Sequence, residues 1–479
     1  MPANRRLLCL LCLALATGAA ESNEPLALHP QNPNRFLFRG EPIVLLTSGE
    51  HYGALVNLDF DFRTYLDELA SDGLNHTRVF AGAYRETPES FGITDNPLAP
   101  AAGRFVCPWA VAETRPDGRQ RFDLTSWNAG YVVRLKALMR EASQRGIVVE
   151  LTLFSPMYND AIWQACPMHA DNNVNGFGDC DRNEVLTLEN EELSAVQIEM
   201  TRKLAEELRG VDNLYFEVCN EPYTSDVPEA WEQRIASEIN RVDPDRLVSR
   251  NVASHTKRID KAPPGVSILT FHYATPPKAV SDNSHLRVAV GANESGFRGS
   301  DDAVYRTEAW AFLLAGGAIY NNLDYSFTPA HPDGSFTSYE SPGGGGPELR
   351  EQLGVLKRFL DQFDLVRMRP AGEAVATSDG VSLQALADPG RCYAVYLHTP
   401  LGWKPKDLAE FASTRRSARV ELDVPPGDYR LRWWDPAAGP LEDPSRLSHP
   451  GGVLQLDSPA FGIDVALCVE REGPHASQE

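Results

Sequence analysis

Short apolar runs alternate with longer amphipathic stretches from about residue 42 onward. The runs are apolar throughout, as in strands buried on both faces, while the stretches place apolar residues at helical spacing. The expected strands are residues 43–46, 75–80, 147–154, 214–219, 247–252, 268–273, 288–291 and 318–323. The expected helices carry apolar stripes within residues 62–70, 131–142, 193–208, 229–242, 305–315 and 349–363.

Eight strands with helices between most of them predict a parallel sheet covered by helices. The number favours a closed (β/α)8 barrel, the TIM-barrel fold, which we place at residues 35–368. No GxGxxG turn opens a helix, which argues against a dinucleotide-binding fold. Two insertions, at about residues 82–126 and 155–190, follow strands. We therefore expect them at the carboxyl-terminal rim of the barrel, where active sites lie.

The pattern changes after residue 369. Turn signals such as Pro425-Pro426-Gly427-Asp428 separate short β-type runs at residues 384–386, 392–397, 419–424, 429–434, 453–456 and 463–470. This predicts a small all-β sandwich domain at residues 370–472. Trp433 and Trp434 alternate faces there, so we expect one in the core and treat the other as a candidate carbohydrate platform. The whole chain is thus expected to be an α/β protein, a TIM barrel followed by a small all-β sandwich.

The first residues resemble a secretory signal peptide. Arg5 and Arg6 precede an apolar run at residues 7–16, and small residues follow at 17–20. Because the run is too short to cross a bilayer, we expect residues 1–20 to be removed and the protein to be secreted or periplasmic. In an oxidising compartment, Cys166 and Cys180 could form a disulfide, since they share one loop-like stretch.

Composition and charge narrow the choice of partners. The 479 residues are 42% hydrophobic and 23% charged, which suits a globular protein. A formal net charge of −21 repels phosphates and anionic lipids, so we expect no nucleic acid, no membrane insertion, and neutral rather than uronic sugars. After residue 20 there is no CxxC motif, no Cys/His cluster with zinc spacing and no His-x-His. We therefore expect no metal and no cofactor; the oligomeric state is left open.

Two glutamates directly follow apolar strands. Residues 214–222 read Leu-Tyr-Phe-Glu-Val-Cys-Asn-Glu-Pro, and Pro222 ends the strand just after Glu221. Residues 288–296 place Glu294 in the same way. Because the carboxyl ends of barrel strands meet at one mouth, we expect the two carboxyl groups to face each other across a cleft. Glycosidic bond cleavage requires such a pair, with one group as proton donor and the other as nucleophile.

At these residues the barrel resembles glycoside hydrolase clan A, the retaining (β/α)8 hydrolases that include the family 5 cellulases and mannanases. The resemblance covers roughly residues 40–365 and implies that Glu221 is the acid/base and Glu294 the nucleophile. It also implies contacts with the substrate or the nucleophile for Asn220, Arg78, His272 and Tyr273.

Two features depart from the family pattern. His272 and Tyr273 are adjacent, whereas family 5 often has one residue between them, which leaves open which of the two faces the nucleophile. The strand-8 tryptophan of the family is missing, which argues against a typical family 5 member. Asn321-Asn322-Leu323-Asp324-Tyr325 stands there instead, and we take Asn322 as a candidate substrate contact.

Four further residues have both a functional and a structural interpretation. His51 follows the first strand and is a candidate sugar-binding residue, with a structural role as the alternative. Trp109 lies in the first insertion, where an aromatic ring can stack on a sugar or anchor a loop. Glu150 and Glu217 lie within strands, so we interpret them as buried carboxylates that form hydrogen bonds inside the barrel, with a catalytic role as the alternative.

The sequence therefore predicts a secreted retaining glycoside hydrolase that acts on an oligosaccharide, polysaccharide or glycoside. A carbohydrate-binding barrel without catalysis and a transglycosylase with the same residues remain as alternatives. The sugar, the linkage and the choice between endo and exo action are left open.

Overall fold

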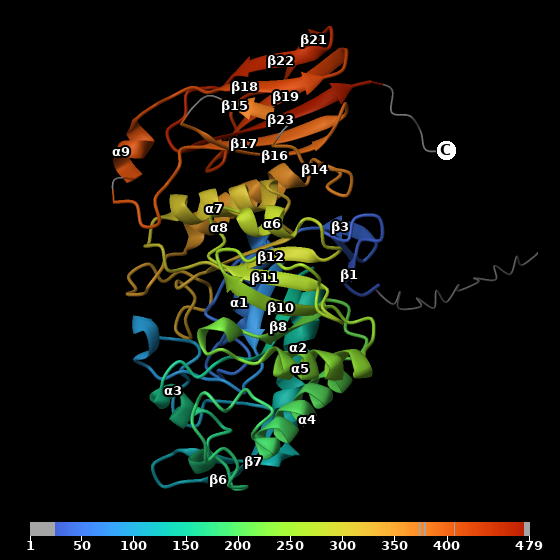
Figure 1. Cartoon of the computed structure of the whole chain (residues 1–479). Helices are drawn as coiled ribbons and strands as arrows, with labels where there is room; N and C mark the ends of the chain where they lie inside the picture. Colours follow the sequence, from blue (N-terminus) through green and yellow to red (C-terminus); the bar gives the residue numbers. More distant parts are fainter. Residues whose placement is uncertain (1–23, 373–374, 378–379, 407, 474–479) are drawn as a thin grey trace, which may run out of the picture.

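The apolar strands form one parallel eight-stranded sheet, the barrel at the centre of Figure 1. The computed structural model describes residues 24–372, 375–377, 380–406 and 408–473. The strands are β4 (Leu45–Gly49), β5 (His76–Phe80), β8 (Val148–Phe154), β9 (Leu214–Cys219), β10 (Val248–Ser254), β11 (Ile268–His272), β12 (Ala289–Glu294) and β13 (Ile319–Leu323). They follow chain order around the barrel, which confirms the predicted TIM-barrel fold.

Helices cover the outside of the barrel between most of the strands. They are α1 (Phe62–Ser71), α2 (Ala129–Gln144), α4 (Glu191–Glu207), α5 (Glu229–Val242), α6 (Lys278–Asn283), α7 (Asp302–Leu314) and α8 (Pro347–Leu360). Local signals set their bounds. The side chain of Asn128 accepts the Tyr131 N–H at 3.1 Å at the start of α2, and Gly146, with φ of 70°, follows its end.

The barrel closes at a seam between β4 and β5, where the side chain of Asn75 replaces a pair of strand hydrogen bonds. Its Oδ1 accepts the Leu46 N–H at 2.9 Å, and its Nδ2 donates to the Val44 carbonyl at 2.9 Å. The Asn75 N–H donates to the Leu46 carbonyl at 3.2 Å. Backbone groups that would otherwise be buried without partners are thereby satisfied.

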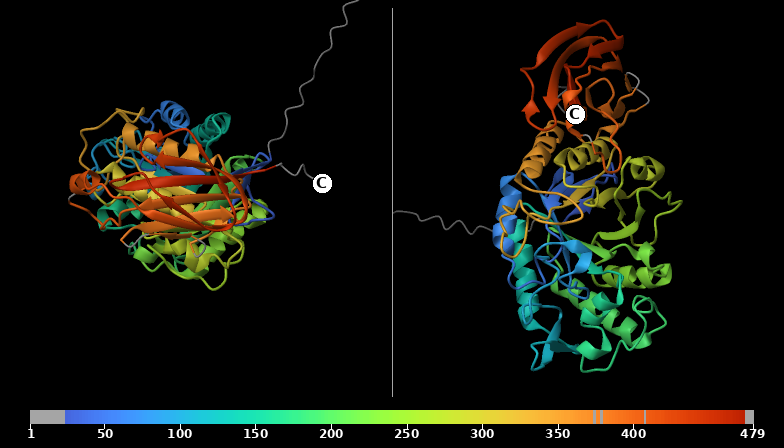
Figure 2. Two further views of the ribbon diagram at one scale, coloured as in Figure 1. Left: turned by 90° about the horizontal axis from the view of Figure 1, so that it is seen from above. Right: turned by 90° about the vertical axis from the view of Figure 1, so that its left-hand side faces the viewer.

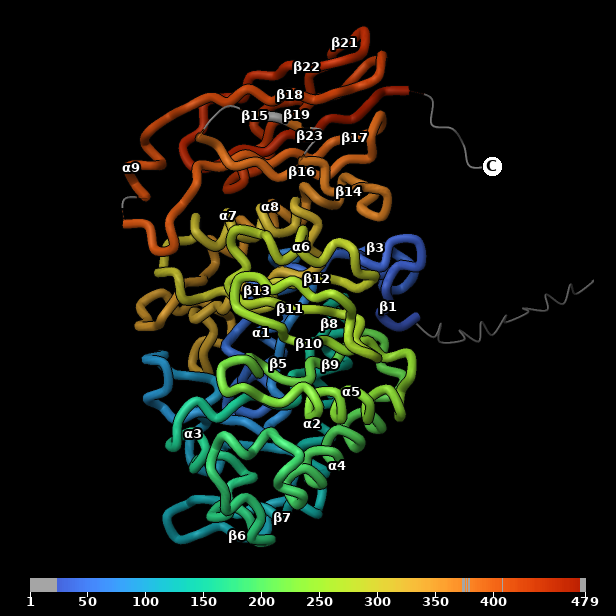
Figure 3. Tube along the Cα trace, viewed as in Figure 1, coloured from blue at the N-terminus to red at the C-terminus, as the bar shows by residue number. Residues whose placement is uncertain are grey.

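A small antiparallel sheet closes the amino-terminal end of the barrel. It consists of β1 (Ala27–Leu28), β2 (Phe36–Phe38) and β3 (Glu41–Ile43). Phe36 packs in one apolar cluster with Leu45 and Ile268, the first residues of β4 and β11. In the view of Figure 3, β1 and β3 lie on the side opposite to α3 (Asp160–Ala165) and α9 (Leu408–Ser413).

The two insertions carry short elements of their own. The first contains the single turn η1 (Ser90–Gly92) and a hairpin of β6 (Trp109–Thr114) and β7 (Gln120–Trp127). The second contains α3 and the turn η2 (Ala170–Asn172).

The C-terminal part is a sandwich of two antiparallel sheets, stacked on the barrel at one end of the molecule (Figures 1 and 2). The larger sheet contains β14 (Arg369–Pro370), β16 (Ser382–Asp388), β17 (Cys392–His398), β19 (Gly427–Asp435), β20 (Gly439–Pro440), β21 (Ser445–His449) and β23 (Asp464–Glu472). The smaller sheet contains β15 (Val375–Thr377), β18 (Arg419–Val424) and β22 (Gly452–Asp457).

Helices α7 and α8 lie between the barrel and the sandwich (Figure 1). Trp310 of α7 stacks on Tyr396 of β17 with ring centroids 5.3 Å apart, and Phe359 of α8 meets Trp434 edge-on at 5.5 Å. Arg306 of α7 pairs with the buried carboxylate of Asp464 at 2.9 Å. The sandwich is therefore joined to the barrel by both apolar contact and a buried ion pair.

Two expectations about side chains need correction. Trp433 and Trp434 are both buried, because the sandwich core and the barrel interface take one ring each, so neither is an exposed platform. Cys166 and Cys180 are free thiols, and the Cys166 Sγ lies 3.4 Å from the Met157 Sδ instead.

The predicted signal peptide, residues 1–20, lies outside the described residues. Within the described ranges, no helix combines the length and apolarity that crossing a membrane requires.

We predict that Asn75→Ala weakens the barrel seam. The substitution leaves the Leu46 N–H and the Val44 carbonyl without partners, which should lower the free energy of unfolding by roughly 2–4 kcal/mol. Urea denaturation followed by tryptophan fluorescence measures the change. Asn183→Ala, at an exposed site, is the matched control and should change the free energy by less than about 0.5 kcal/mol. Equal effects of the two substitutions would contradict the role of Asn75.

Candidate active site

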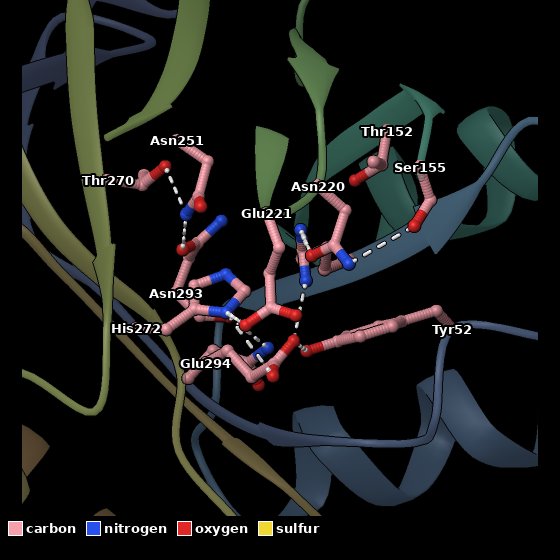
Figure 4. Close-up of polar contacts among 12 residues, drawn as sticks. Tyr52, Thr152, Ser155, Asn220, Glu221, Asn251, Thr270, His272, Asn293 and Glu294 are labelled. Carbon is pink, nitrogen blue, oxygen red and sulfur yellow. Dashed lines mark hydrogen bonds and ion pairs between the residues drawn. The ribbon is translucent and has the colours of Figure 1, made fainter. Parts of the chain in front are cut away.

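The ends of β9 and β12 bring two glutamates together at one mouth of the barrel (Figure 4). One carboxylate oxygen of Glu221, one of Glu294 and a ring nitrogen of His272 lie within 4.8 Å of one another. His272, the last residue of β11, bridges the pair. Its Nδ1 lies 2.9 Å from the Glu221 Oε1 and 3.3 Å from the Glu294 Oε1.

Glu294 is surrounded by hydrogen-bond donors and positive charge. The Tyr273 hydroxyl donates to its Oε1 at 2.6 Å, the Tyr52 hydroxyl to its Oε2 at 3.0 Å, and the Arg78 Nη1 to the same oxygen at 3.3 Å. Burial alone would raise the pKa of Glu294. The charge and hydrogen bond of His272, the charge of Arg78 and the hydrogen bond of Tyr273 hold this pKa well below its usual range. Glu294 is therefore an anion at neutral pH.

His272 carries a positive charge between the two carboxylates. Burial would lower the pKa of His272, but the charge of Glu294 and the hydrogen bond to Glu221 raise it to about 9. At neutral pH the Nδ1–H group of His272 can therefore donate a hydrogen bond to either glutamate.

His272 and Tyr273 both contact Glu294 although they are adjacent in the chain. Side chains of neighbouring residues in a regular strand point to opposite faces. Here the register between β11 and β12 shifts at Phe271 and His272, and Tyr273 has a positive φ of 52°. The strand alternation ends at this point, so the Tyr273 hydroxyl turns to Glu294 while His272 stays between the two carboxylates. The sequence leaves open which of the two faces Glu294; in the structure both do.

Glu221 lies where the chain turns sharply after β9. Its backbone has a φ of 39°, and Pro222 begins the single turn η3 (Pro222–Thr224). The Tyr158 hydroxyl donates to Glu221 Oε2 at 2.7 Å, and the Tyr223 hydroxyl to Oε1 at 3.1 Å. The Glu221 side chain is 13% exposed, against 7% for Glu294, so the former is the more accessible to water.

Arg78 on β5 is the buried cation beneath the site. Its Nε donates to the Glu217 Oε2 at 3.1 Å, and its Nη2 donates to the same oxygen. The Nη2 also donates to the Asn220 Oδ1 at 2.8 Å, and the Asn220 Nδ2 donates to the Tyr158 hydroxyl at 2.8 Å. Glu217 is therefore a buried counter-ion within the strand, as its position predicts, and one cation positions both Glu294 and Asn220.

Glu150 is a further buried carboxyl group next to this network. The Tyr215 hydroxyl and the Asn293 Nδ2 donate to it at 2.8 and 2.9 Å. Burial, together with the charge of Glu217, raises the pKa of Glu150 well above its usual range. Glu150 therefore holds a proton at neutral pH, which reduces the negative charge around Arg78.

An open pocket lies directly over the two glutamates. Its lining residues from the barrel are His51, Tyr52, Phe80, Asn220, Glu221, Tyr273, Glu294, Phe297 and Leu323. Its lining residues from the rim insertions are Tyr84, Glu86, Phe91, Leu98 and Tyr158. Three of these side chains are carboxylates, and no lysine or arginine is among the described residues of the lining. Such a lining disfavours anionic ligands.

His51 lies in the pocket wall as part of a buried ion pair. Its Nε2 is 3.1 Å from the Glu86 Oε2. The Tyr84 hydroxyl and the Asn96 Nδ2 also donate to Glu86, at 3.0 and 2.6 Å. Burial would lower the pKa of His51, but the charge and hydrogen bond of Glu86 raise it overall.

Glu221, His272 and Glu294 are, among the described residues, the group whose ligand atoms could surround a metal ion. Glu294 already accepts three hydrogen bonds, one of them from the guanidinium of Arg78. A fixed cation at 3.3 Å opposes a metal ion at that carboxylate. These three donors therefore suit a carboxylate anion without a metal better than a metal ligand.

Comparison with solved structures identifies proteins of the same fold. A glycoside hydrolase aligns over 96% of this chain and 98% of its own, with a TM-score of 0.64 and 14% identity. A glycoside hydrolase family 5 protein from Bacteroides vulgatus aligns over 95% of each chain, with a TM-score of 0.64 and 13% identity. No protein-family model and no curated protein sequence matches the chain.

The chain has the fold of these glycoside hydrolases. The alignments span the barrel and the sandwich together, so the combination of the two recurs in them. At 13–14% identity the likeness shows the fold, and the role of the site depends on its own geometry.

Seven of the nine predicted site residues lie at the pocket or directly beneath it: Glu221, Glu294, Asn220, Arg78, His272, Tyr273 and His51. The other two do not. Trp109 is fully buried at the start of β6, where it anchors the hairpin. Asn322 is fully buried in β13, and its Nδ2 donates to the Ser48 Oγ and to the Leu323 carbonyl. The predictions of substrate contacts for Trp109 and Asn322 are therefore wrong.

Sequence reasoning missed several residues at the site, including Tyr52, Glu86 and Tyr223. Only Tyr52 of these three stands out in its backbone, with a positive φ of 57°; Glu86 and Tyr223 have no such mark. Of the eight non-glycine residues with positive φ in the described parts, five lie at or beside the pocket: Tyr52, Phe91, Glu221, His255 and Tyr273. Strained conformations of this kind persist where the surrounding structure fixes them, and they gather at functional sites.

The raised pKa of His272 predicts a pH dependence of stability. This pKa rises from 6.5 to about 9 on folding. The contribution of His272 to the free energy of unfolding is therefore complete below about pH 6.5 and is lost as the pH rises through 9. At roughly 1.4 kcal/mol per pKa unit, the loss is about 3 kcal/mol. His272→Asn keeps an N–H near the Nδ1 position without titrating. Urea denaturation at pH 6.5 and at pH 9.5 should therefore show that the free energy of unfolding falls less for this variant than for the wild type. Equal falls in wild type and variant would contradict the assignment.

Proposed function

We propose that the protein is a retaining glycoside hydrolase in which Glu294 is the nucleophile and Glu221 the acid/base. The separation of the two carboxyl groups carries this proposal, because their oxygens lie within 4.8 Å of each other. Retaining enzymes hold the two groups about 5–5.5 Å apart, whereas inverting enzymes separate them by about 6.5–9.5 Å to admit a water molecule.

In the first step a carboxylate oxygen of Glu294 attacks the anomeric carbon of the sugar. A covalent bond forms between them while the bond from that carbon to the glycosidic oxygen breaks. Glu221 gives its proton to the departing oxygen, which leaves as a hydroxyl group. The His272 Nδ1 lies 2.9 Å from the Glu221 Oε1, within hydrogen-bond reach of the group that gives the proton.

In the second step Glu221, now an anion, removes a proton from a water molecule. The water oxygen attacks the same anomeric carbon, and the bond to Glu294 breaks. The sugar leaves with its original anomeric configuration after two inversions, and both glutamates return to their starting states. The greater exposure of Glu221 suits a group that must meet water in this step.

The neighbours of Glu294 supply what a nucleophile needs. Arg78 and His272 keep it charged, and the hydroxyls of Tyr52 and Tyr273 hold one oxygen each. These bonds also stabilise the carboxylate when it departs from the sugar in the second step.

The pocket favours a neutral sugar. Glu86, Glu221 and Glu294 line it, and a uronic acid or a phosphosugar would meet these negative charges. If residues 1–20 act as a signal peptide, as their pattern indicates, the enzyme meets its substrate outside the cytoplasm.

We predict that Glu294→Ala and Glu221→Ala each lower kcat by roughly 10³-fold or more. Azide, a small anionic nucleophile, should restore turnover of an activated aryl glycoside in both variants. In Glu294→Ala it takes the place of the nucleophile and yields a glycosyl azide of inverted configuration. In Glu221→Ala it takes the place of water and yields a product of retained configuration. NMR of the products distinguishes the two.

The control for this experiment is Glu191→Gln, which removes an exposed carboxylate at the start of α4 and should leave turnover unchanged. Exchanged product configurations would reverse the two roles. Normal activity of Glu294→Ala would reject the proposed function.

A further inference from the structure

An arc of aromatic side chains borders the pocket and ends on a residue of the sandwich. The arc consists of Tyr158, Phe91, Phe297, Tyr273 and Trp403, with centroids of successive rings 5.4, 6.5, 5.8 and 6.0 Å apart. The first four residues line the pocket. Trp403 comes from the segment between β17 and α9, which in Figure 1 descends from the sandwich toward the barrel.

Trp403 lies one side chain away from the nucleophile. Its ring meets the edge of Tyr273 at 6.0 Å, and the Tyr273 hydroxyl bonds Glu294. It also meets His255, just after β10, at 5.2 Å. The sandwich is thus in direct contact with the mouth of the barrel as well as with α7 and α8.

A buried arginine holds the Trp403 segment in place. The Arg298 Nε donates to the Trp403 carbonyl and its Nη2 to the Gly402 carbonyl, both at 3.2 Å, and its guanidinium lies over the Trp403 ring at 5.1 Å. Arg298 is itself fixed by the buried Glu308, 3.0 Å from its Nη1. The segment is therefore positioned before any ligand arrives, which lowers the entropic cost of binding.

Trp403 nevertheless remains 39% exposed. Among the described residues, the large hydrophobic side chains that are markedly exposed include two aromatic ones, Trp403 and Phe91. Both belong to the arc, although it is a small part of the molecular surface. An exposed aromatic ring next to a reactive pocket offers an apolar surface on which the C–H face of a sugar can stack.

We propose that the sandwich completes the substrate site, with Trp403 stacking on a sugar unit next to the one held over Glu221 and Glu294. This inference rests on the proposed function, and it specifies the substrate as a chain of at least two linked neutral sugars. A monosaccharide glycoside fills the pocket but does not reach Trp403.

The test compares substrates of different length in Trp403→Ala. For β-1,4-linked gluco- and manno-oligosaccharides of two to six units, kcat/KM should fall about fivefold more than for the matching aryl monoglycosides, mainly through KM. Trp403→Phe should recover much of the loss. Val453→Ala, which removes an exposed side chain on the far sheet of the sandwich, should change neither. Equal losses on short and long substrates would overturn the proposal and leave Trp403 as a support for Tyr273.

Calorimetry separates this proposal from the proposed function. The same oligosaccharides are titrated into Glu294→Gln and into the double variant that also carries Trp403→Ala. The Trp403 site is supported if Glu294→Gln binds longer oligosaccharides more tightly and the double variant binds them about fivefold more weakly. This holds even if the wild-type protein hydrolyses none of the probes. Absence of binding by Glu294→Gln, or binding unaffected by Trp403→Ala, would overturn it.

Discussion

The single positive charge of Arg78, buried at the centre of the barrel, is the constraint on which the site depends. Charges are stable in such surroundings only when they are paired. Glu217 accepts two hydrogen bonds from Arg78, Glu294 accepts a third, and Glu150 avoids a further negative charge by keeping its proton. His272 adds a second positive charge on the other side of Glu294. This balance allows Glu294, the proposed nucleophile, to stay charged inside a mostly apolar barrel.

The same balance explains why the two glutamates differ. Glu294 is the last residue of β12 and lies next to both cations. Glu221 itself has a left-handed backbone conformation after β9. Its partners are tyrosine hydroxyls and His272, and its side chain is more exposed to water. Two carboxyl groups in unlike surroundings can hold different protonation states and so take different roles. The aromatic arc then reaches from the pocket to Trp403, a residue of the sandwich.

Much of the fold could be predicted from the sequence, because strands buried on both faces leave continuous apolar runs, as at residues 214–219. Strand ends also predicted that Glu221 and Glu294 meet at one mouth of the barrel, and the family resemblance pointed to Arg78. What the pattern could not show depends on long-range geometry. Asn75 closes a seam that local spacing does not reveal, and Trp403 reaches the pocket across a domain boundary. Trp109 and Asn322 have suitable residue types for sugar contact, but the packing of β6 and β13 turns them inward.

The anomeric configuration of the first sugar released tests the central claim most directly. Inverting glycosidases separate their two carboxyl groups to admit a water molecule, whereas Glu221 and Glu294 lie close together, so the account predicts a double displacement. NMR recorded in the first minutes of hydrolysis, before the sugar mutarotates, should show the configuration of the substrate. Release of the opposite anomer would contradict the account, because it would require direct attack by water.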